Sequence, residues 1–239
     1  MRPRFEHVYQ RSTGLLPPKI AARVDLLRPS LVDVWGGALN GQQRRRELVA
    51  QIAAGGRFDR VIETGTFRGA STEYLADAFA VPVETVENDP RLYAYSDRRL
   101  RAAHRISVRF GDSRAFLRQL AESAPPSETA FFYLDAHWND DLPLAEELEI
   151  IGSGWARCVV MIDDFEVPGD AGYAFDDYGE GKALTAEYLP AVTLAGWSLS
   201  YPSAPAVSET GSRRGCCVLA SPPCAALLGV PGLGPARVL

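Results

Sequence analysis

The stretch ETGTFRGAS (residues 63–71) joins a short apolar run at 58–64 to an amphipathic segment that follows it. Glycine at 65 and 69 lets the backbone bend sharply and lets a ligand approach without meeting a Cβ atom. The N-terminus of a following helix favours a negative group such as a carboxylate. Two glycines alone are also compatible with a plain strand-to-helix turn. The position between a strand and a helix favours a ligand crevice.

Outward from this turn, β-rich apolar runs alternate with amphipathic helical stretches, the pattern of a parallel sheet covered on both faces. The first five runs are 58–64, 83–87, 106–110, 130–135 and 158–163. Two later runs, 196–201 and 215–220, have no helix-length segment between them and can pair as an antiparallel hairpin. The predicted fold class is therefore α/β, a doubly wound, Rossmann-like, mostly parallel sheet of seven strands with a terminal antiparallel hairpin.

The chain divides into a central domain and two flanking segments. Residues 58–220 carry the sheet pattern and are the expected ligand-binding domain. Residues 1–57 are interpreted as two or three helices that form a cap or an oligomer arm, which leaves a homodimer open. Residues 221–239 are rich in proline and glycine, so we expect a loosely held tail.

Composition excludes several classes of partner. A net charge of −5 argues against nucleic acid, whose binding normally requires a basic patch. The arginines at 44–46 and 98–101 are interpreted as solvated helix faces. No apolar run approaches the roughly 20 residues needed to span a bilayer, and no signal peptide is evident. We therefore expect a cytoplasmic protein with no membrane partner. The four cysteines lack metal-like spacing and are expected to be reduced and buried.

Acidic residues stand at the ends of the second and third runs. Glu87 ends the run 83–87, where a carboxylate can accept both hydroxyls of a ribose; the alternative is an exposed loop acid. Asp112 follows the run 106–110, where it can accept from an adenine amino group or simply cap the next helix. These positions predict a nucleotide-like ligand.

Three further acids follow the fourth and fifth runs, namely Asp135, Asp163 and Asp164. The carboxyl ends of parallel strands meet at one edge, so the three carboxylates should converge. Such a cluster is costly without a positive partner, and oxygen ligands suit Mg²⁺. The alternative is that one or two of these acids cap loops. His137 titrates near neutral pH and is a candidate general base, or it lines the bound ligand instead.

A long connection, FEVPGDAGYAFDDYGEG (165–181), separates Asp164 from a helix expected near Lys182. Long loops at the ligand-binding edge of a sheet are commonly lids or substrate sites. The predicted lid residues are Tyr173, Phe175, Asp177 and Tyr178. An acidic, aromatic lid suits a cationic or polyhydroxylated small molecule, whereas the alternative is a disordered acidic loop.

Together the segments ETGTFRGAS, TVENDP, LDAHW and MIDDFEVPG resemble, in order, the motifs of cation-dependent, catechol-type O-methyltransferases, which use S-adenosylmethionine. The similarity runs over roughly residues 60–170. It implies a class I methyltransferase fold and a cofactor site whose methionine end is held by Glu63, Gly65 and Gly69. Thr66 and Ser71 belong to the same turn.

The resemblance also assigns the remaining site residues. It implies that Glu87 holds the ribose and that Ser113, His137 and Trp138 surround the adenine, near Asp112. Asp135, Asp163 and Asp164 fall on the metal-ligand positions, and Asp135, His137 and Asp163 are the candidate catalytic residues. The family typically has asparagine at the position of Asp164 and a lysine at that of Asn139, and this chain has an additional alanine before His137.

These observations predict methyl transfer from S-adenosylmethionine to a small-molecule acceptor, most simply at an oxygen, with Mg²⁺ as an optional second cofactor. Two other classes of protein are alternatives to this prediction. A nicotinamide-dependent oxidoreductase would share the glycine turn and Glu87, but position 67 is Phe where a dinucleotide fingerprint needs glycine. A non-catalytic nucleotide-binding protein of the same fold would keep the cofactor site alone.

Overall fold

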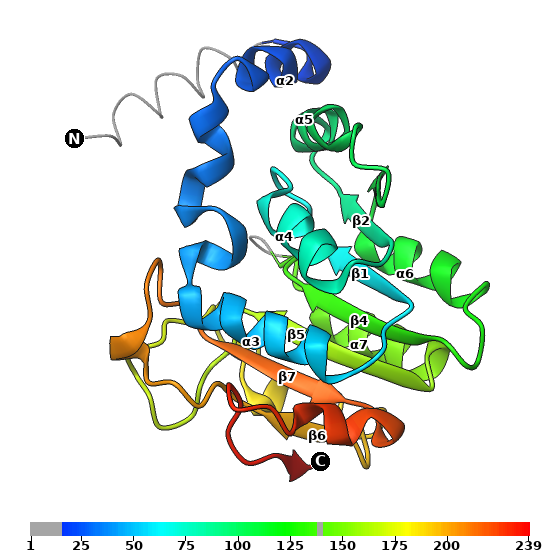
Figure 1. Ribbon diagram of the computed structural model, residues 1–239, viewed down its shortest axis with the longest axis vertical. Helices are drawn as coiled ribbons and strands as arrows, with labels where there is room; N and C mark the ends of the chain where they lie inside the picture. Colours follow the sequence, from blue (N-terminus) through cyan, green and yellow to red (C-terminus); the bar gives the residue numbers. More distant parts are fainter. Residues whose placement is uncertain (1–15, 138–140) are drawn as a thin grey trace.

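Short runs of buried side chains build one sheet of eight strands in the order β3-β2-β1-β4-β5-β7-β6-β8 (Figure 1). The computed structural model describes residues 16–137 and 141–239. The strands are β1 Arg60–Thr64, β2 Val83–Glu87, β3 Ile106–Phe110, β4 Thr129–Leu134, β5 Arg157–Asp163, β6 Ser198–Ser200, β7 Cys216–Ala220 and β8 Arg237–Val238. Strands β1 to β5 are parallel, and β7 lies antiparallel between β5 and β6. The predicted fold class is confirmed, with β8 as an additional strand.

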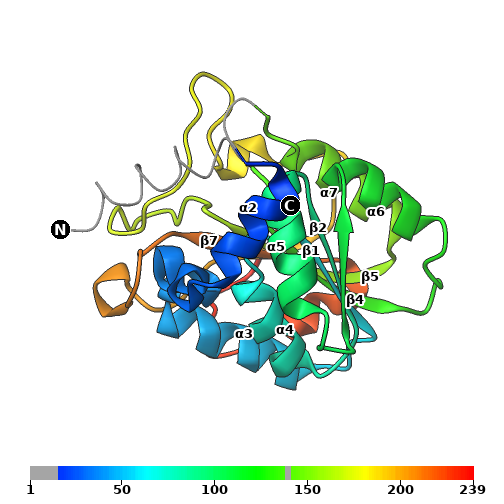
Figure 2. The same cartoon turned by 90° about the horizontal axis from the view of Figure 1, so that it is seen from above.

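Helices cover both faces of the sheet because successive side chains of a strand point to opposite sides. On β4, Phe131 and Tyr133 join one core with helices α3 (Gln43–Gly55) and α4 (Ala70–Phe79). Phe132 and Leu134 join the other core with α6 (Ser113–Ala121) and α7 (Leu144–Gly154). Figure 2 shows α3 and α4 on one side of the sheet and α6 and α7 on the other. The doubly wound arrangement is thus confirmed.

The segment before the sheet runs along one side of the molecule (Figure 1). Helix α2 (Pro18–Leu26) packs against α5 (Pro90–Leu100), where the Asp25 carboxylate accepts two hydrogen bonds from Arg91 at 2.6 and 2.7 Å. Two short 3₁₀ helices, η1 (Pro29–Gly36) and η2 (Ala38–Gly41), then lead into α3. This path brings η2 and the start of α3 to the carboxyl end of β5.

Two expectations about the C-terminal half are wrong. Between β5 and β6 the structure has only one 3₁₀ turn, η3 (Ala186–Tyr188), and no α-helix near Lys182. Pro190 and the glycines around this stretch leave no run long enough to form one. The segment after β7 is packed, because η5 (Pro222–Leu228) buries Cys224 and Leu228 in the α3 core and β8 pairs with β6.

The prediction for the cysteines is confirmed. The four cysteines are free and buried. Within residues 16–137 and 141–239, every helix is too short or too polar to cross a membrane.

Candidate active site

The backbone turn after β1 lies at the point where the strand order reverses, between β1 and β4. Ligands of open α/β sheets bind at this point, outside the carboxyl ends of the strands. Gly65 has φ +88°, and a Cβ there would overlap the carbonyl oxygen of Asp135 and lie 2.7 Å from its carbonyl carbon. Gly69, with φ +76°, precedes the first residue of α4. Only glycine at position 65 lets the two strand ends meet.

Glu63, on β1, is buried below this turn. Its Oε2 atom accepts hydrogen bonds from the hydroxyls of Thr72 and Thr85, and the Thr85 hydroxyl also contacts that of Thr66 at 2.6 Å. Its Oε1 atom has no hydrogen-bond partner in the described protein. Burial raises the pKa of Glu63 to about 7. The turn therefore carries a buried carboxylate oxygen that lacks a donor.

Glu87 ends β2 beside the same turn and is 7% exposed, so it is not an exposed loop acid. Its Oε2 accepts from the backbone N–H of Phe67 at 2.7 Å, and its Oε1 accepts from that of Asp89 at 2.9 Å. Burial raises the pKa of Glu87, while these N–H groups oppose the rise. Each oxygen keeps a lone pair for a further donor.

The remaining predicted cofactor residues occupy three different environments. Asp112 caps α6, since its carboxylate accepts from the backbone N–H groups of Arg114 and Ala115 at 3.0 and 3.1 Å. Ser113 follows it and is buried. The Ser71 hydroxyl accepts from the backbone N–H of Leu39 at 3.1 Å, which ties η2 to α4. Trp138 and Asn139 lie outside the described residues.

Asp163, the last residue of β5, is completely buried and fully engaged. Its Oδ1 forms an ion pair with Arg45 of α3. Its Oδ2 accepts from the Tyr133 hydroxyl and from the side-chain amide of Asn40 at 3.0 Å. Burial and Asp163 both raise the pKa of Tyr133 well above its usual range, so the hydroxyl stays protonated.

Arg45 corrects the interpretation of residues 44–46 as a solvated face, because it is 3% exposed. Burial alone would lower its pKa, but the Asp163 carboxylate raises it, so the guanidinium remains charged. A signal was present in the sequence, since Arg45 shares one helix face with Leu48, Val49 and Ile52 at helical spacing. Arg45 therefore supplies part of the positive charge that the clustered acids require.

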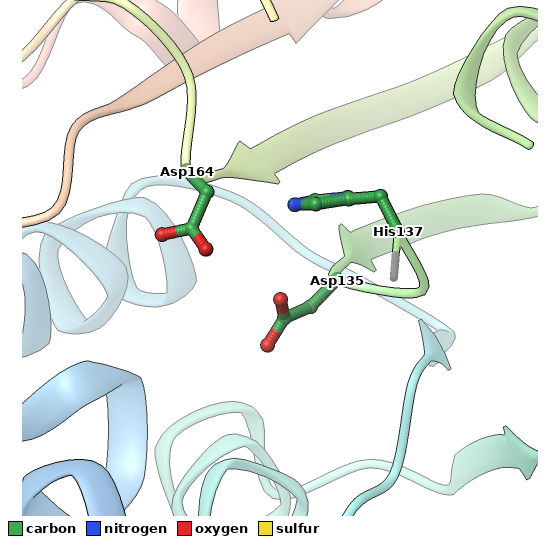
Figure 3. Close-up of side chains that lie close together, drawn as sticks. All are labelled: Asp135, His137 and Asp164. Atoms are coloured by element: carbon green, nitrogen blue, oxygen red, sulfur yellow. The ribbon is translucent and has the colours of Figure 1, made fainter. Parts of the chain in front are cut away.

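Asp135, His137 and Asp164 form the group whose ligand atoms come together, with one atom from each lying within 4.8 Å of the others. Figure 3 shows their side chains turned toward one another from the ends of β4 and β5. Of the predicted metal ligands, Asp135 and Asp164 belong to this group, and His137 stands in the place expected for Asp163. The reason is that both oxygens of Asp163 are already occupied.

Local charges act strongly on this group. Burial raises the pKa of Asp135 well above its usual range, and Asp163 and Asp164 raise it further. Burial and Asp163 also raise the pKa of Asp164 to about 7, although the Arg214 Nε atom donates to its Oδ1 at 2.6 Å. Burial lowers the pKa of His137, which keeps the imidazole neutral at neutral pH.

The connection after β5 packs over Asp135, His137 and Asp164. It is therefore not the disordered acidic loop that the sequence allowed as an alternative. The Tyr178 hydroxyl lies 2.5 Å from Asp176 and 3.1 Å from the His137 carbonyl oxygen, and Arg214 bridges Asp164 and Asp176. Tyr173 is buried in a small core with Val167 and Ala206. Phe175 is half-buried and Asp177 is exposed. Arg214 had no sequence signal, because it precedes a strand instead of following one.

Comparison with solved structures identifies the fold. An O-methyltransferase from Bacillus cereus in complex with SAH aligns over 90% of this chain and 97% of its own, with 17% identity and a TM-score of 0.55. The O-methyltransferase TomG from Streptomyces achromogenes, involved in tomaymycin synthesis and solved with SAM, aligns over 92% and 99%, with 17% identity and a TM-score of 0.54. No protein-family model and no curated protein matches the sequence.

The chain therefore has the class I methyltransferase fold, as its strand order and site position indicate. The motifs resemble those of O-methyltransferases, and the two aligned O-methyltransferases share the fold over 90% and 92% of this chain.

Proposed function

We propose that this protein transfers a methyl group from S-adenosylmethionine to an oxygen of a small-molecule acceptor. One observation carries the proposal, the buried Oε1 atom of Glu63 that has no donor beside the Gly65 turn. Leaving such an atom without a partner costs about 1 to 3 kcal/mol. The ammonium group of the methionine end of the cofactor is a suitable donor.

Charge favours this cofactor over a dinucleotide. S-adenosylmethionine carries a positive ammonium and a positive sulfonium group, and the carboxylates of Glu63, Glu87 and Asp135 surround the turn. The same carboxylates would repel the pyrophosphate of NAD, and Phe67 occupies a position where the dinucleotide fingerprint has glycine. Glu87, with a free lone pair on each oxygen, suits the ribose diol.

Methyl transfer is a direct displacement that needs mainly alignment. The acceptor oxygen forms a bond to the methyl carbon while the carbon–sulfur bond breaks, which leaves a neutral thioether and releases the acceptor proton. The neutral imidazole of His137 is the group suited to take that proton, because burial lowers its pKa, whereas burial raises the pKa of Asp135 and favours its protonated form. Asp163 is unsuited, because Arg45, Tyr133 and Asn40 occupy its oxygens.

The all-carboxylate Mg²⁺ site predicted from Asp135, Asp163 and Asp164 does not fit the arrangement of these residues. A ligand needs a lone pair directed at the ion, and Asp163 directs one oxygen at Arg45 and the other at two donors. Positive charge from Arg45 and Arg214 already offsets part of the acidic cluster. The proposed transfer therefore includes no step through Mg²⁺ at this set.

Glu87→Gln should weaken S-adenosylmethionine binding by about 1 to 3 kcal/mol, the usual cost of losing charge-assisted hydrogen bonds. The amide keeps the shape of the side chain, so the fold should persist. Isothermal titration calorimetry measures the change. Glu84→Gln is the matched control, since Glu84 lies on the same strand but pairs with Arg60 and Arg109. Equal affinities for the two variants would remove Glu87 from the cofactor site.

Cofactor affinity should rise with pH through about 7, the pKa of Glu63. Below that pKa, Glu63 holds a proton that a cationic ligand must displace, at about 1.4 kcal/mol per pH unit. Above it the carboxylate is already ionised and the dependence should level off. Titrations between about pH 6 and pH 8 measure this. The pKa of Glu147 is also about 7. The Glu63→Gln variant is therefore the control that shows which of the two carboxyl groups causes the pH dependence. An unchanged pH profile in Glu63→Gln would contradict the assignment.

The connection after β5 should recognise the acceptor. Phe175→Ala should raise the acceptor KM about tenfold, roughly the value of a lost aromatic contact, while the affinity for S-adenosylhomocysteine stays within twofold. Steady-state kinetics and calorimetry measure the two quantities. Val207→Ala, at a 78% exposed position in η4 (Ala206–Ser208), is the control. A loss of cofactor affinity in Phe175→Ala would make the loop a cofactor element instead.

A turnover assay tests the proposed function directly. The purified protein is incubated with methyl-labelled S-adenosylmethionine and a panel of hydroxylated, aminated and carbon-acid small molecules. Labelled product and stoichiometric S-adenosylhomocysteine with a hydroxylated acceptor support the proposal, and Glu87→Gln should slow the reaction at low cofactor concentration. Hydride transfer with NADH in a parallel assay, together with no methyl transfer, would overturn it.

A further inference from the structure

Arg214 lies at the carboxyl-end edge of the sheet because it precedes β7, which runs antiparallel to β5. One buried side chain holds both of its backbone groups. The N–H of Arg214 donates to Oε1 of Gln42 at 2.7 Å, and its carbonyl oxygen accepts from Nε2 of Gln42 at 3.0 Å. Arg45 donates to the same carbonyl oxygen. The fold therefore fixes the backbone from which the Arg214 side chain extends.

The guanidinium of Arg214 is anchored by two of its three nitrogen atoms. Nε donates to Oδ1 of Asp164 at 2.6 Å, and Nη2 donates to Asp176. Nη1 has no hydrogen-bond partner within residues 16–137 and 141–239. The side chain is 23% exposed, which leaves it accessible to a ligand. Arg214 thus offers an oriented donor that the described protein does not use.

This donor lies near the group that takes the acceptor proton in the proposed reaction. One oxygen of Asp164, the anchor of Arg214, is within 4.8 Å of an imidazole nitrogen of His137, and Figure 3 shows the two side chains facing each other. Burial lowers the pKa of His137, and the nearby charge of Arg214 contributes to the decrease. The Nε2 atom of His137 also has no hydrogen-bond partner in the described protein. An unused proton acceptor and an unused donor therefore lie near one carboxylate.

Oxygen and nitrogen nucleophiles differ in what they can offer these two groups. A hydroxyl oxygen has two lone pairs and one proton. It can direct one lone pair at the methyl carbon, accept from Nη1 of Arg214 with the other, and give its proton to His137. A neutral amine nitrogen has only one lone pair, which methyl transfer uses. It cannot accept from Arg214 at the same time, and a donor that loses water without a new partner costs free energy.

We propose that Arg214 is a catalytic residue that contacts the acceptor and selects an oxygen over a nitrogen nucleophile. The inference rests on the proposed function. The oxygen–carbon bond forms while the carbon–sulfur bond breaks, the electron pair of that bond moves to sulfur, and the hydroxyl proton moves to His137. The hydrogen bond from Nη1 orients the oxygen and stabilises the negative charge that develops as its proton leaves.

The ion pairs of Arg214 also narrow the acceptor class expected from the connection after β5. The acids of this connection suit a cationic or a polyhydroxylated molecule, but Asp176 is already paired with the guanidinium, as is Asp164. A cationic group of the acceptor would meet the charge of Arg214 at close range. A neutral hydroxylated acceptor would meet a hydrogen-bond donor there instead.

Phenol and aniline test the proposal by binding alone, because they share one ring and differ in a hydroxyl and an amino group. The aniline nitrogen is a poor acceptor, since its lone pair is delocalised into the ring. Each probe is titrated into the full chain saturated with S-adenosylhomocysteine, and ligand-observed NMR gives the dissociation constants. The wild-type complex should bind phenol at least tenfold more tightly than aniline.

Arg214→Gln should bind the two probes with similar affinity. Arg213→Gln is the matched control, because it removes the same charge at the exposed neighbouring position, and it should keep the wild-type preference. In the turnover assay, Arg214→Gln should lower the ratio of O-methylation to N-methylation at least tenfold. A purely structural ion pair would change both reactions alike.

Equal affinities of the wild-type complex for the two probes, no binding of phenol, or an unchanged preference in Arg214→Gln would each overturn the proposal. Arg214→Lys is the second variant, in case Arg214→Gln does not fold. Lysine keeps the charge but has one nitrogen in place of the fork, so the preference should fall as well. Methyl transfer to a hydroxylated acceptor with no effect of Arg214→Gln on the preference rejects this inference and leaves the proposed function intact. No binding of S-adenosylhomocysteine rejects the proposed function, and this inference with it.

Discussion

Gly65→Ala is expected to reduce S-adenosylmethionine affinity at least a hundredfold, the largest effect on binding among these variants. Alanine meets two costs at this position. The φ of +88° is unfavourable for a residue with a Cβ, by roughly 1 to 2 kcal/mol. The Cβ would also overlap the backbone of Asp135, so the ends of β1 and β4 must separate. That separation displaces the turn on which the proposed cofactor site is built.

Gly169→Ala is the matched control, because Gly169 has a similar φ of +83° but no heavy atom within 4 Å of the added Cβ. It carries the conformational cost without the overlap. Calorimetry should give wild-type cofactor affinity for Gly169→Ala and little or no heat for Gly65→Ala. A Gly65→Ala variant that binds as well as the control would show that the contact between the strand ends is not needed for the site.

Arg45→Met should lower the free energy of unfolding by about 3 to 5 kcal/mol, the usual cost of breaking a buried ion pair from one side. Methionine has a similar shape but leaves the Asp163 carboxylate buried with only uncharged donors, namely the Tyr133 hydroxyl, the Asn40 amide and the backbone N–H of Asp164. It also removes one of two donors to the Arg214 carbonyl oxygen, the other being the side-chain amide of Gln42. Urea unfolding measures the loss. Arg44→Met, one residue earlier and with a half-exposed side chain, should change stability by less than about 0.5 kcal/mol.

A double variant separates the ion pair from the packing of Arg45. Arg45→Met combined with Asp163→Leu removes both charges, and paired hydrophobic replacements of buried ion pairs are often neutral. The double variant should therefore recover most of the stability that the single variant loses, with a positive coupling energy in the double-mutant cycle. Equal losses for Arg45→Met and Arg44→Met would contradict the assigned ion pair.

The sheet could be predicted from the sequence because its signals are local. Each strand is a short apolar run, and the turn at Gly65 to Gly69 marks the first crossover, so the seven predicted runs match β1 to β7 within two residues. The crowding of acids at one edge followed from topology alone, since parallel strands end together. The position of Glu87 beside the glycine turn was predictable for the same reason.

The contacts within the site could not be predicted, because they depend on tertiary packing. Arg45 and Asp163 are 118 residues apart, and nothing local joins them. Strand topology predicts which residues end β4 and β5, but the αL conformation of Asp164 and the reach of α3 decide which side chains meet. These two features place His137 with Asp135 and Asp164. The packed C-terminal segment was missed because proline and glycine also occur in ordered 3₁₀ turns such as η5.

The proposed function depends on the binding of S-adenosylmethionine at the carboxyl ends of β1 and β4. Isothermal titration of the full chain with S-adenosylhomocysteine, S-adenosylmethionine and NAD tests it most directly. We expect one equivalent of either methionine-derived ligand to bind and NAD to give no heat, and Gly65→Ala should abolish binding. Binding of NAD with no response to S-adenosylmethionine or S-adenosylhomocysteine would contradict the proposed function.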